Sequence, residues 1–174
     1  MANYIAKTLV VVAGLLGLRQ YYRNWGTTKG ECEQPLPGDD LVRAPASQTT
    51  EGVWVNAPSD VVWAELLRTL RDRAHVGRRL GVVVQMADIS EGNHIVLQST
   101  PTGLHAGSTW SVSVIPHGID RCRILLRGRI GLRHPGQVVG VELSGPLRAI
   151  ATRAMLRGVR RRVERISSTQ RTRQ

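Results

Sequence analysis

The chain has 174 residues, is 41% hydrophobic and 21% charged, and carries a formal net charge of +11. This length suits one domain with a sizeable core plus a segment at one end, and the composition excludes a largely disordered chain. Two cysteines, Cys32 and Cys122, are too few for a disulfide framework. Neither has Cys or His at metal-ligand spacing, so we expect free thiols, or one disulfide as the alternative, and no zinc site.

An uncharged apolar run, 8-TLVVVAGLLGL-18, lies near the N-terminus. With its neighbours it gives a segment from Ala2 to Tyr22, which is long enough to span a membrane if Lys7 lies near one interface. We therefore predict a membrane anchor over residues 1–24. A cleaved signal peptide and a buried helix are the alternatives, although no A-x-A-like cleavage site follows the run.

The orientation of such an anchor follows from its flanking charges. Arg19, Arg23 and Lys29 follow the run, and Lys7 alone precedes it. The positive-inside rule then predicts a single-pass membrane protein whose C-terminal domain is cytoplasmic.

Residues 25–50 are rich in Gly, Pro, Thr and Asp without sustained periodicity, which predicts a linker arm. A short strand over 53–55 follows. Pro58 has a φ suited to a first helical turn and precedes an apolar stripe at helical spacing, which predicts a helix to about Arg73. The stripe consists of Val62, Trp63, Leu66, Leu67 and Leu70.

Four strands are predicted after this helix, over residues 79–87, 93–100, 107–116 and 121–130. In the last two, apolar residues alternate with polar ones. The inward-facing residues are Trp110, Val112, Val114, Cys122, Ile124 and Leu126, and four arginines share the opposite face of the last strand. One buried face and one face in water indicate an antiparallel sheet.

A long helix ends the domain, with Pro146 near its start. Its apolar residues recur at i, i+3/i+4 and i+7: Leu147, Ile150, Ala151, Ala154, Met155, Gly158, Val159, Val163 and Ile166. From Arg148 onward the chain has nine Arg and one acid, Glu164.

This basic cluster predicts contact with an anionic membrane surface, mainly through Arg157, Arg160, Arg161 and Arg165. A solvated helix face is the alternative. Nucleic-acid binding is less favoured because no aromatic residues are interleaved with the arginines and no recognised motif is present.

Three blocks of the sequence resemble one family: 25-WGTTKGECEQPLPGDDLV-42, 53-VWVNAPSDVVWAEL-66 and 153-RAMLRGVRRRVE-164. They are similar to the START-like, helix-grip (SRPBCC) superfamily of polyketide cyclase/dehydrase and lipid-transport type, and within it to a membrane-anchored actinobacterial branch. The resemblance implies an α+β domain over 51–166, with an antiparallel sheet wrapped around a long C-terminal helix, and a basic tail over 167–174. The branch's W-Y-S-Y-D-like and P-E-W-like stretches are absent, which implies a shorter sheet or a smaller cavity.

The resemblance also implies an apolar small molecule or lipid bound between the sheet and the last helix. Small residues on the predicted inward face of that helix would leave the sheet's concavity unfilled. The predicted ligand-binding residues are Trp110, Val112, Val114, Ile124, Leu126, Ala151, Ala154, Met155 and Gly158.

Two alternatives to ligand binding stay open. In the first, the core is filled and the domain is a structural or protein-interaction module at the membrane. In the second, the domain is a cyclase- or dehydrase-like enzyme. The sequence contains no paired carboxylates and no H-x-x-x-H or H-E-x-x-H motif. It therefore indicates no catalytic residue, metal or cofactor, and catalysis is the less favoured function.

Overall fold

The structure is a computed structural model that describes residues 19–79, 84–99, 107–132 and 134–171, and four isolated positions before residue 19. Its centre is a five-stranded antiparallel sheet with the strand order β1-β5-β4-β3-β2. The strands are β1 (Ser47–Val55), β2 (Val84–Ser90), β3 (His94–Ser99), β4 (Ser108–Pro116) and β5 (Cys122–Ile130).

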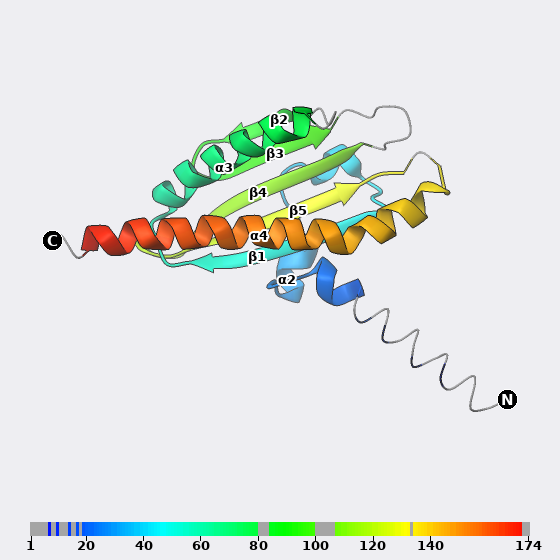
Figure 1. The fold of residues 1–174 in the computed structure, drawn as a ribbon, viewed down its shortest axis with the longest axis horizontal. Coiled ribbons are helices and arrows are strands. Elements are labelled where there is room, and N and C mark those ends of the chain that lie inside the picture. The colour runs from blue at the N-terminus through cyan, green and yellow to red at the C-terminus, as the bar shows by residue number, and fades with distance from the viewer. Residues whose placement is uncertain are drawn as a thin grey trace.

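Helices cover both faces of this sheet. The helices α3 (Ser59–Arg79) and α4 (Gln137–Arg171) lie on one face, with α4 along β1 and β5 and α3 above β2 and β3 (Figure 1). The short helix α2 (Lys29–Glu33) and the 3₁₀ helix η1 (Asp39–Val42) lie on the other. The predicted α+β fold, with an antiparallel sheet against a long C-terminal helix, is confirmed.

The hydrophobic core lies between the sheet and its two long helices. Side chains at every second strand position meet apolar residues of both helices, and all are at most 6% exposed. Burial of each such side chain stabilises the fold by about 1.5–3 kcal/mol. They are Val53, Val55, Val112, Val114, Ile124 and Leu126 from the strands, Val62 and Leu66 from α3, and Leu156, Val159 and Val163 from α4.

The face of α4 that packs on the sheet agrees only in part with the predicted one, since Met155, Val159 and Val163 are buried as predicted. Ala149, Leu156 and Val159 are buried, whereas Ala151 and Ala154 are exposed. The prediction that these two alanines face the sheet is wrong. The first half of α4 has apolar residues on two faces, since Leu147 and Ile150 are 71% and 63% exposed, so spacing alone does not decide which face packs.

The start of α4 also differs from the prediction, because the helix begins at Gln137 and contains Pro146 in its interior. Proline has no backbone N–H, so the helical bond to the carbonyl of Glu142, four residues earlier, is missing, and side chains near this point donate to the carbonyl next to it. Here Ser144 Oγ and Arg148 Nη2 donate to the Val141 carbonyl at 3.1 and 2.9 Å.

The second face of the sheet is covered by the N-terminal arm, which we define as residues 25–46. Arginines of β5 hold it there: Arg123 pairs with Glu31 at 2.8 Å, and Arg127 pairs with Asp39 at 2.7 Å. The expectation that this arginine face is in water is therefore wrong, because its charges are matched by carboxylates of the arm. Both Cys32, in the arm, and the buried Cys122 are free thiols, as expected.

More than half of the predicted membrane anchor, residues 1–24, lies outside the described residues, which include positions 7, 10, 14 and 17 and residues 19–24 of it. Across the part of the chain that the structure describes, no helix combines the length and apolar character that crossing a bilayer requires. Arg19 and Arg23, expected beside a membrane interface, instead bind Glu142 of α4 at 2.7 and 2.5 Å. The prediction of a single-pass membrane protein with a cytoplasmic domain is corrected accordingly.

Candidate functional site

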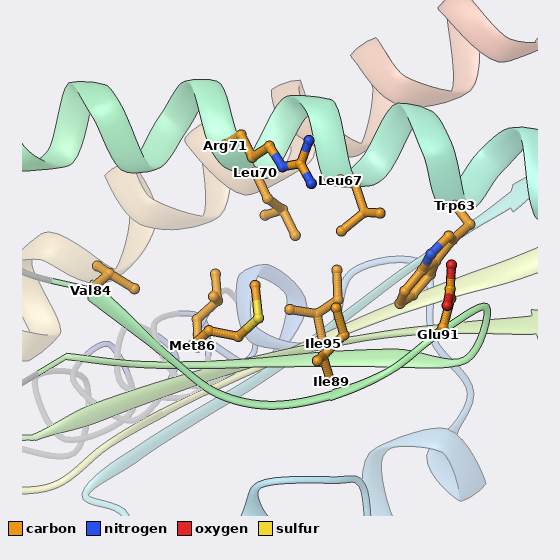
Figure 2. A pocket seen from close by; sticks show the side chains of 10 residues that line it. Trp63, Leu67, Leu70, Arg71, Val84, Met86, Ile89, Glu91 and Ile95 are labelled. Carbon is orange, nitrogen blue, oxygen red and sulfur yellow. The ribbon is translucent and has the colours of Figure 1, made fainter.

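A cavity of about 670 Å³ lies between α3 and the β2–β3 edge of the sheet (Figure 2). Small-molecule sites typically have volumes of about 300–1,000 Å³. Eight apolar residues line this cavity together with two charged ones, Arg71 and Glu91. The apolar residues are Trp63, Leu67, Leu70, Val84, Met86, Ile89, Ile95 and Leu97.

The helix α3 supplies the upper wall in Figure 2. Trp63, Leu67 and Leu70 recur at i, i+4 and i+7, so they share one face of the helix and point toward the strands. Val62 and Leu66 lie on the neighbouring face and are fully buried in the core. The apolar stripe predicted for this helix is thus divided between two tasks, because one part packs the core and the other lines the cavity.

An irregularity in β2 shapes the opposite wall. The register with β3 shifts between Met86 and Asp88, so that Met86 lies opposite Leu97 and Ile89 lies opposite Ile95. In a regular strand, residues three apart point to opposite faces. The bulge turns Met86 and Ile89 to the same side, and both line the cavity.

The cavity is open to solvent along the β2 edge of the sheet, where Met86 is 57% and Ile89 is 46% exposed. Trp63 closes its other side and is 6% exposed. The Trp63 Nε1 is buried and has no hydrogen-bond acceptor among the described residues. An apolar molecule could therefore enter from the edge. Only a few polar groups of the cavity, those of Trp63, Arg71 and Glu91, would then need polar partners on the ligand.

A second cavity, of about 30 Å³, lies under α4 and holds roughly one water molecule. Glu51 lines it, is 1% exposed, and has no hydrogen-bond donor to its carboxylate among the described residues. Burial raises the pKa of Glu51 to about 7, and the charge of Arg153, whose Nε lies 3.7 Å away, works in the opposite direction.

A carboxyl group that titrates near neutrality is suited to general acid–base chemistry. However, this cavity is too small for an organic substrate, and it shares no lining residue with the larger one. The arrangement around Glu51 therefore gives no support to an enzymatic site.

None of the nine predicted ligand-binding residues lines the larger cavity. Val112, Val114, Ile124 and Met155 belong to the packed core, and Leu126 lies both in this core and beside the small cavity. Trp110 also lines the small cavity, Ala151 and Ala154 are exposed, and Gly158 is half-buried. Their part in ligand binding stays a prediction.

All ten lining residues were missed as site residues, those of α3 because they were predicted as one face of a packed helix, and those of β2 and β3 because these segments were predicted as strands without a role in a site. One signal was available, since Met86 and Ile89 are apolar residues three apart in a strand where period two is the rule. The predicted strand over 79–87 ends before Ile89, whereas β2 extends to Ser90 and includes it.

The arginines of the predicted membrane-contacting face of α4 are partly engaged within the chain. The Arg157 guanidinium lies 4.8 Å from the centre of the Trp25 ring, and Arg160 pairs with Glu164 at 3.1 Å. Arg161 and Arg165 are exposed. Contact of this face with an anionic surface stays a prediction.

Comparison with known proteins gives a fold. No protein-family profile matches the chain, and no curated protein matches it. Among solved structures, a conserved protein from Geobacillus kaustophilus is similar with a TM-score of 0.52 and 8% identity, covering 68% of this chain and 96% of that one. This likeness shows a shared fold and carries no information on chemistry.

Two further solved structures are similar at lower TM-scores, and no conclusion about this chain is based on them. A norcoclaurine synthase point mutant from Thalictrum flavum has a TM-score of 0.47 and 17% identity, covering 65% of this chain and 93% of that one. CalU16 from Micromonospora echinospora has a TM-score of 0.44 and 10% identity, covering 65% and 71%.

Proposed function

We propose that this chain binds an apolar small molecule in the cavity between α3, β2 and β3. The observation that carries the proposal is the lining itself, in which eight of ten residues are apolar around about 670 Å³. Such a composition is typical of sites that take up an apolar ligand and orient it with a few polar groups. Transfer of apolar ligand surface from water into the cavity would supply the binding free energy, about 25 cal/mol for each Å² that is buried.

The proposed position differs from the one implied by the family resemblance. Between the sheet and α4 lie core side chains, among them Leu156 and Val159, which are 0% exposed, and the cavity of about 30 Å³ there is too small for such a ligand. The larger cavity lies instead beside α3, where Trp63 and Leu67 separate the helix from β2 and β3. Membership of the actinobacterial branch of the superfamily is proposed on the three sequence blocks alone.

Catalysis is not part of this proposal. Cyclase- or dehydrase-type chemistry needs polar groups that converge on one point of a bound substrate. The two charged residues of the cavity come from different walls, Arg71 from α3 and Glu91 from the turn between β2 and β3, and they stand apart in Figure 2.

Uptake of an uncharged, environment-sensitive dye tests the proposal. Nile red should bind to the wild-type chain with increased fluorescence. Leu67→Trp should reduce this binding at least about tenfold, because the larger ring occupies the cavity that Leu67 now borders. Leu143→Trp is the matched control, since Leu143 is 77% exposed on α4 and lies outside the cavity. Absence of dye binding by the wild type, or equal binding by all three proteins, would refute the proposal and favour a structural or interaction module.

A further inference from the structure

The two charged residues of the cavity are exposed and have no ionic partner among the residues that the structure describes. Neither Arg71 nor Glu91 forms an ion pair or side-chain hydrogen bond with another residue in the described ranges. Elsewhere in this chain arginines are commonly paired, as Arg68 and Arg162 are with Glu65. Both side chains are exposed, so water solvates their charges while the cavity is empty. Their positions on two different walls of one apolar cavity favour a ligand with two different polar ends.

One end of the cavity has a hydrogen-bond donor as well as a charge. Figure 2 shows Trp63 and Glu91 at the same end, and both line the cavity. The Trp63 Nε1 has no acceptor among the described residues, although the side chain is almost fully buried. A buried N–H without an acceptor costs free energy until a partner supplies one.

The spacing along α3 gives the length of the helical wall of the cavity. Trp63 and Arg71 are eight residues apart, which corresponds to about 12 Å at a rise of 1.5 Å per residue. Leu67 and Leu70 lie between them and present only carbon to the cavity. An apolar body of roughly ten carbons in a zigzag of 1.5 Å bonds spans this length.

We infer that the ligand is an apolar hydroxy acid, with its carboxylate on Arg71 and its hydroxyl between Glu91 and Trp63. This inference rests on the proposed function. A guanidinium binds a carboxylate through charge-assisted hydrogen bonds. A hydroxyl group can donate to the Glu91 carboxylate and accept from the Trp63 N–H at the same time. A second carboxylate on the ligand would be repelled by Glu91, and a carbonyl group has no hydrogen to donate to Glu91.

Calorimetric titration with four ligands of one chain length separates the two ends. The ligands are ω-hydroxydecanoic acid, decanoic acid, methyl ω-hydroxydecanoate and methyl decanoate, so that each polar group is present or absent independently. For the wild-type chain we expect the free acids to bind about 5- to 10-fold more tightly than their esters, and the hydroxylated ligands to bind about 5-fold more tightly than those without a hydroxyl.

Three variants assign these preferences to residues. Arg71→Gln should abolish the preference for acids and leave the preference for hydroxyls, whereas Arg73→Gln, on the same helix but outside the cavity, should change neither. Trp63→Phe and Glu91→Ala should each reduce the preference for hydroxyls and leave the preference for acids. Circular dichroism confirms that each variant is folded.

The outcomes distinguish this inference from the proposed function. If the wild type binds all four ligands equally, or if the preferences survive in Arg71→Gln and Glu91→Ala, the hydroxy acid is refuted while the apolar site stands. If no ligand binds, including methyl decanoate, the proposed function itself is refuted.

Discussion

The guanidinium of Arg127 lies 2.7 Å from the carboxylate of Asp39, and its side chain is 2% exposed. The same group donates to the carbonyls of Glu31 and Cys32 at 2.9 Å, near the end of α2, and to the carbonyl of Gln34 at 2.7 Å. The last carbonyls of a helix lack partners within it, so Arg127 supplies the donors that α2 needs. One strand arginine thus holds both a charge and the backbone of the N-terminal arm.

Replacement of this arginine should release the arm. Arg127→Met should lower the free energy of unfolding by about 3–5 kcal/mol, because it removes one of the two arginines that pair with Asp39 and leaves the carbonyls of Glu31, Cys32 and Gln34 without this donor. Denaturant unfolding measures the change, and limited proteolysis should detect faster cleavage within residues 25–46. Arg121→Met is the control, because Arg121 is exposed and stacks over Trp54. Equal losses in the two variants would contradict this account.

The face of α4 that packs on the sheet can be tested with substitutions of opposite kind. Leu156→Ala should cost about 2–5 kcal/mol, since Leu156 is 0% exposed and its truncation leaves a cavity in the core. Ala151→Leu and Ala154→Leu should change stability by at most about 0.5 kcal/mol, because both positions are exposed. Thermal unfolding of the three variants is the measurement. A large loss in the two leucine variants would restore the face that the spacing suggested.

Gly38 illustrates a close approach of the arm to the sheet. Its φ is +82°, and a Cβ there would lie 2.5 Å from Val96 Cγ1 of β3. Gly118 has a similar φ of +81° but open space around it. Gly118→Ala should therefore cost about 1–2 kcal/mol from backbone conformation alone. Gly38→Ala should cost more, because the methyl group also displaces the arm from Val96. Similar unfolding free energies for the two variants would show that the arm does not pack closely there.

The pH dependence of stability should show the buried carboxyl of Glu51. Its pKa in the folded chain is raised from 4.5 to about 7. Between these values the folded chain keeps a proton that the unfolded chain has lost, so the free energy of unfolding falls as pH rises through this window, by about 3 kcal/mol in total.

Glu51→Gln removes this titration. The free energy of unfolding of the variant minus that of the wild type should therefore increase as pH rises from 4.5 to 8. Urea unfolding at pH values from 4.5 to 8 measures it, with Glu33→Gln as control because the Glu33 side chain is 67% exposed. If the wild-type and Glu51→Gln profiles run parallel, Glu51 is not protonated in the folded chain at pH 5 to 6.

The sequence alone determined the elements whose pattern is local. The alternation predicted strands over 107–116 and 121–130, and β4 and β5 begin and end within one residue of these bounds. Pro58 and the stripe from Val62 to Leu70 predicted the start and the buried side of α3. Each of these signals lies within one turn or one strand pair, so a short window of sequence contains the whole of it.

The tertiary structure alone decided the packed face of α4, the position of the arm and the place of the cavity. In α4 both apolar faces satisfy the helical period, and only contact with β1 and α3 selects the one with Leu156. The arginines of β5 show the same ambiguity. Arginine at every second position is compatible with a strand face in water and equally with a face covered by carboxylates. Arg127 pairs with Asp39, which is 88 residues away in the chain. Pairings of that kind depend on how distant segments meet, and no local periodicity encodes them.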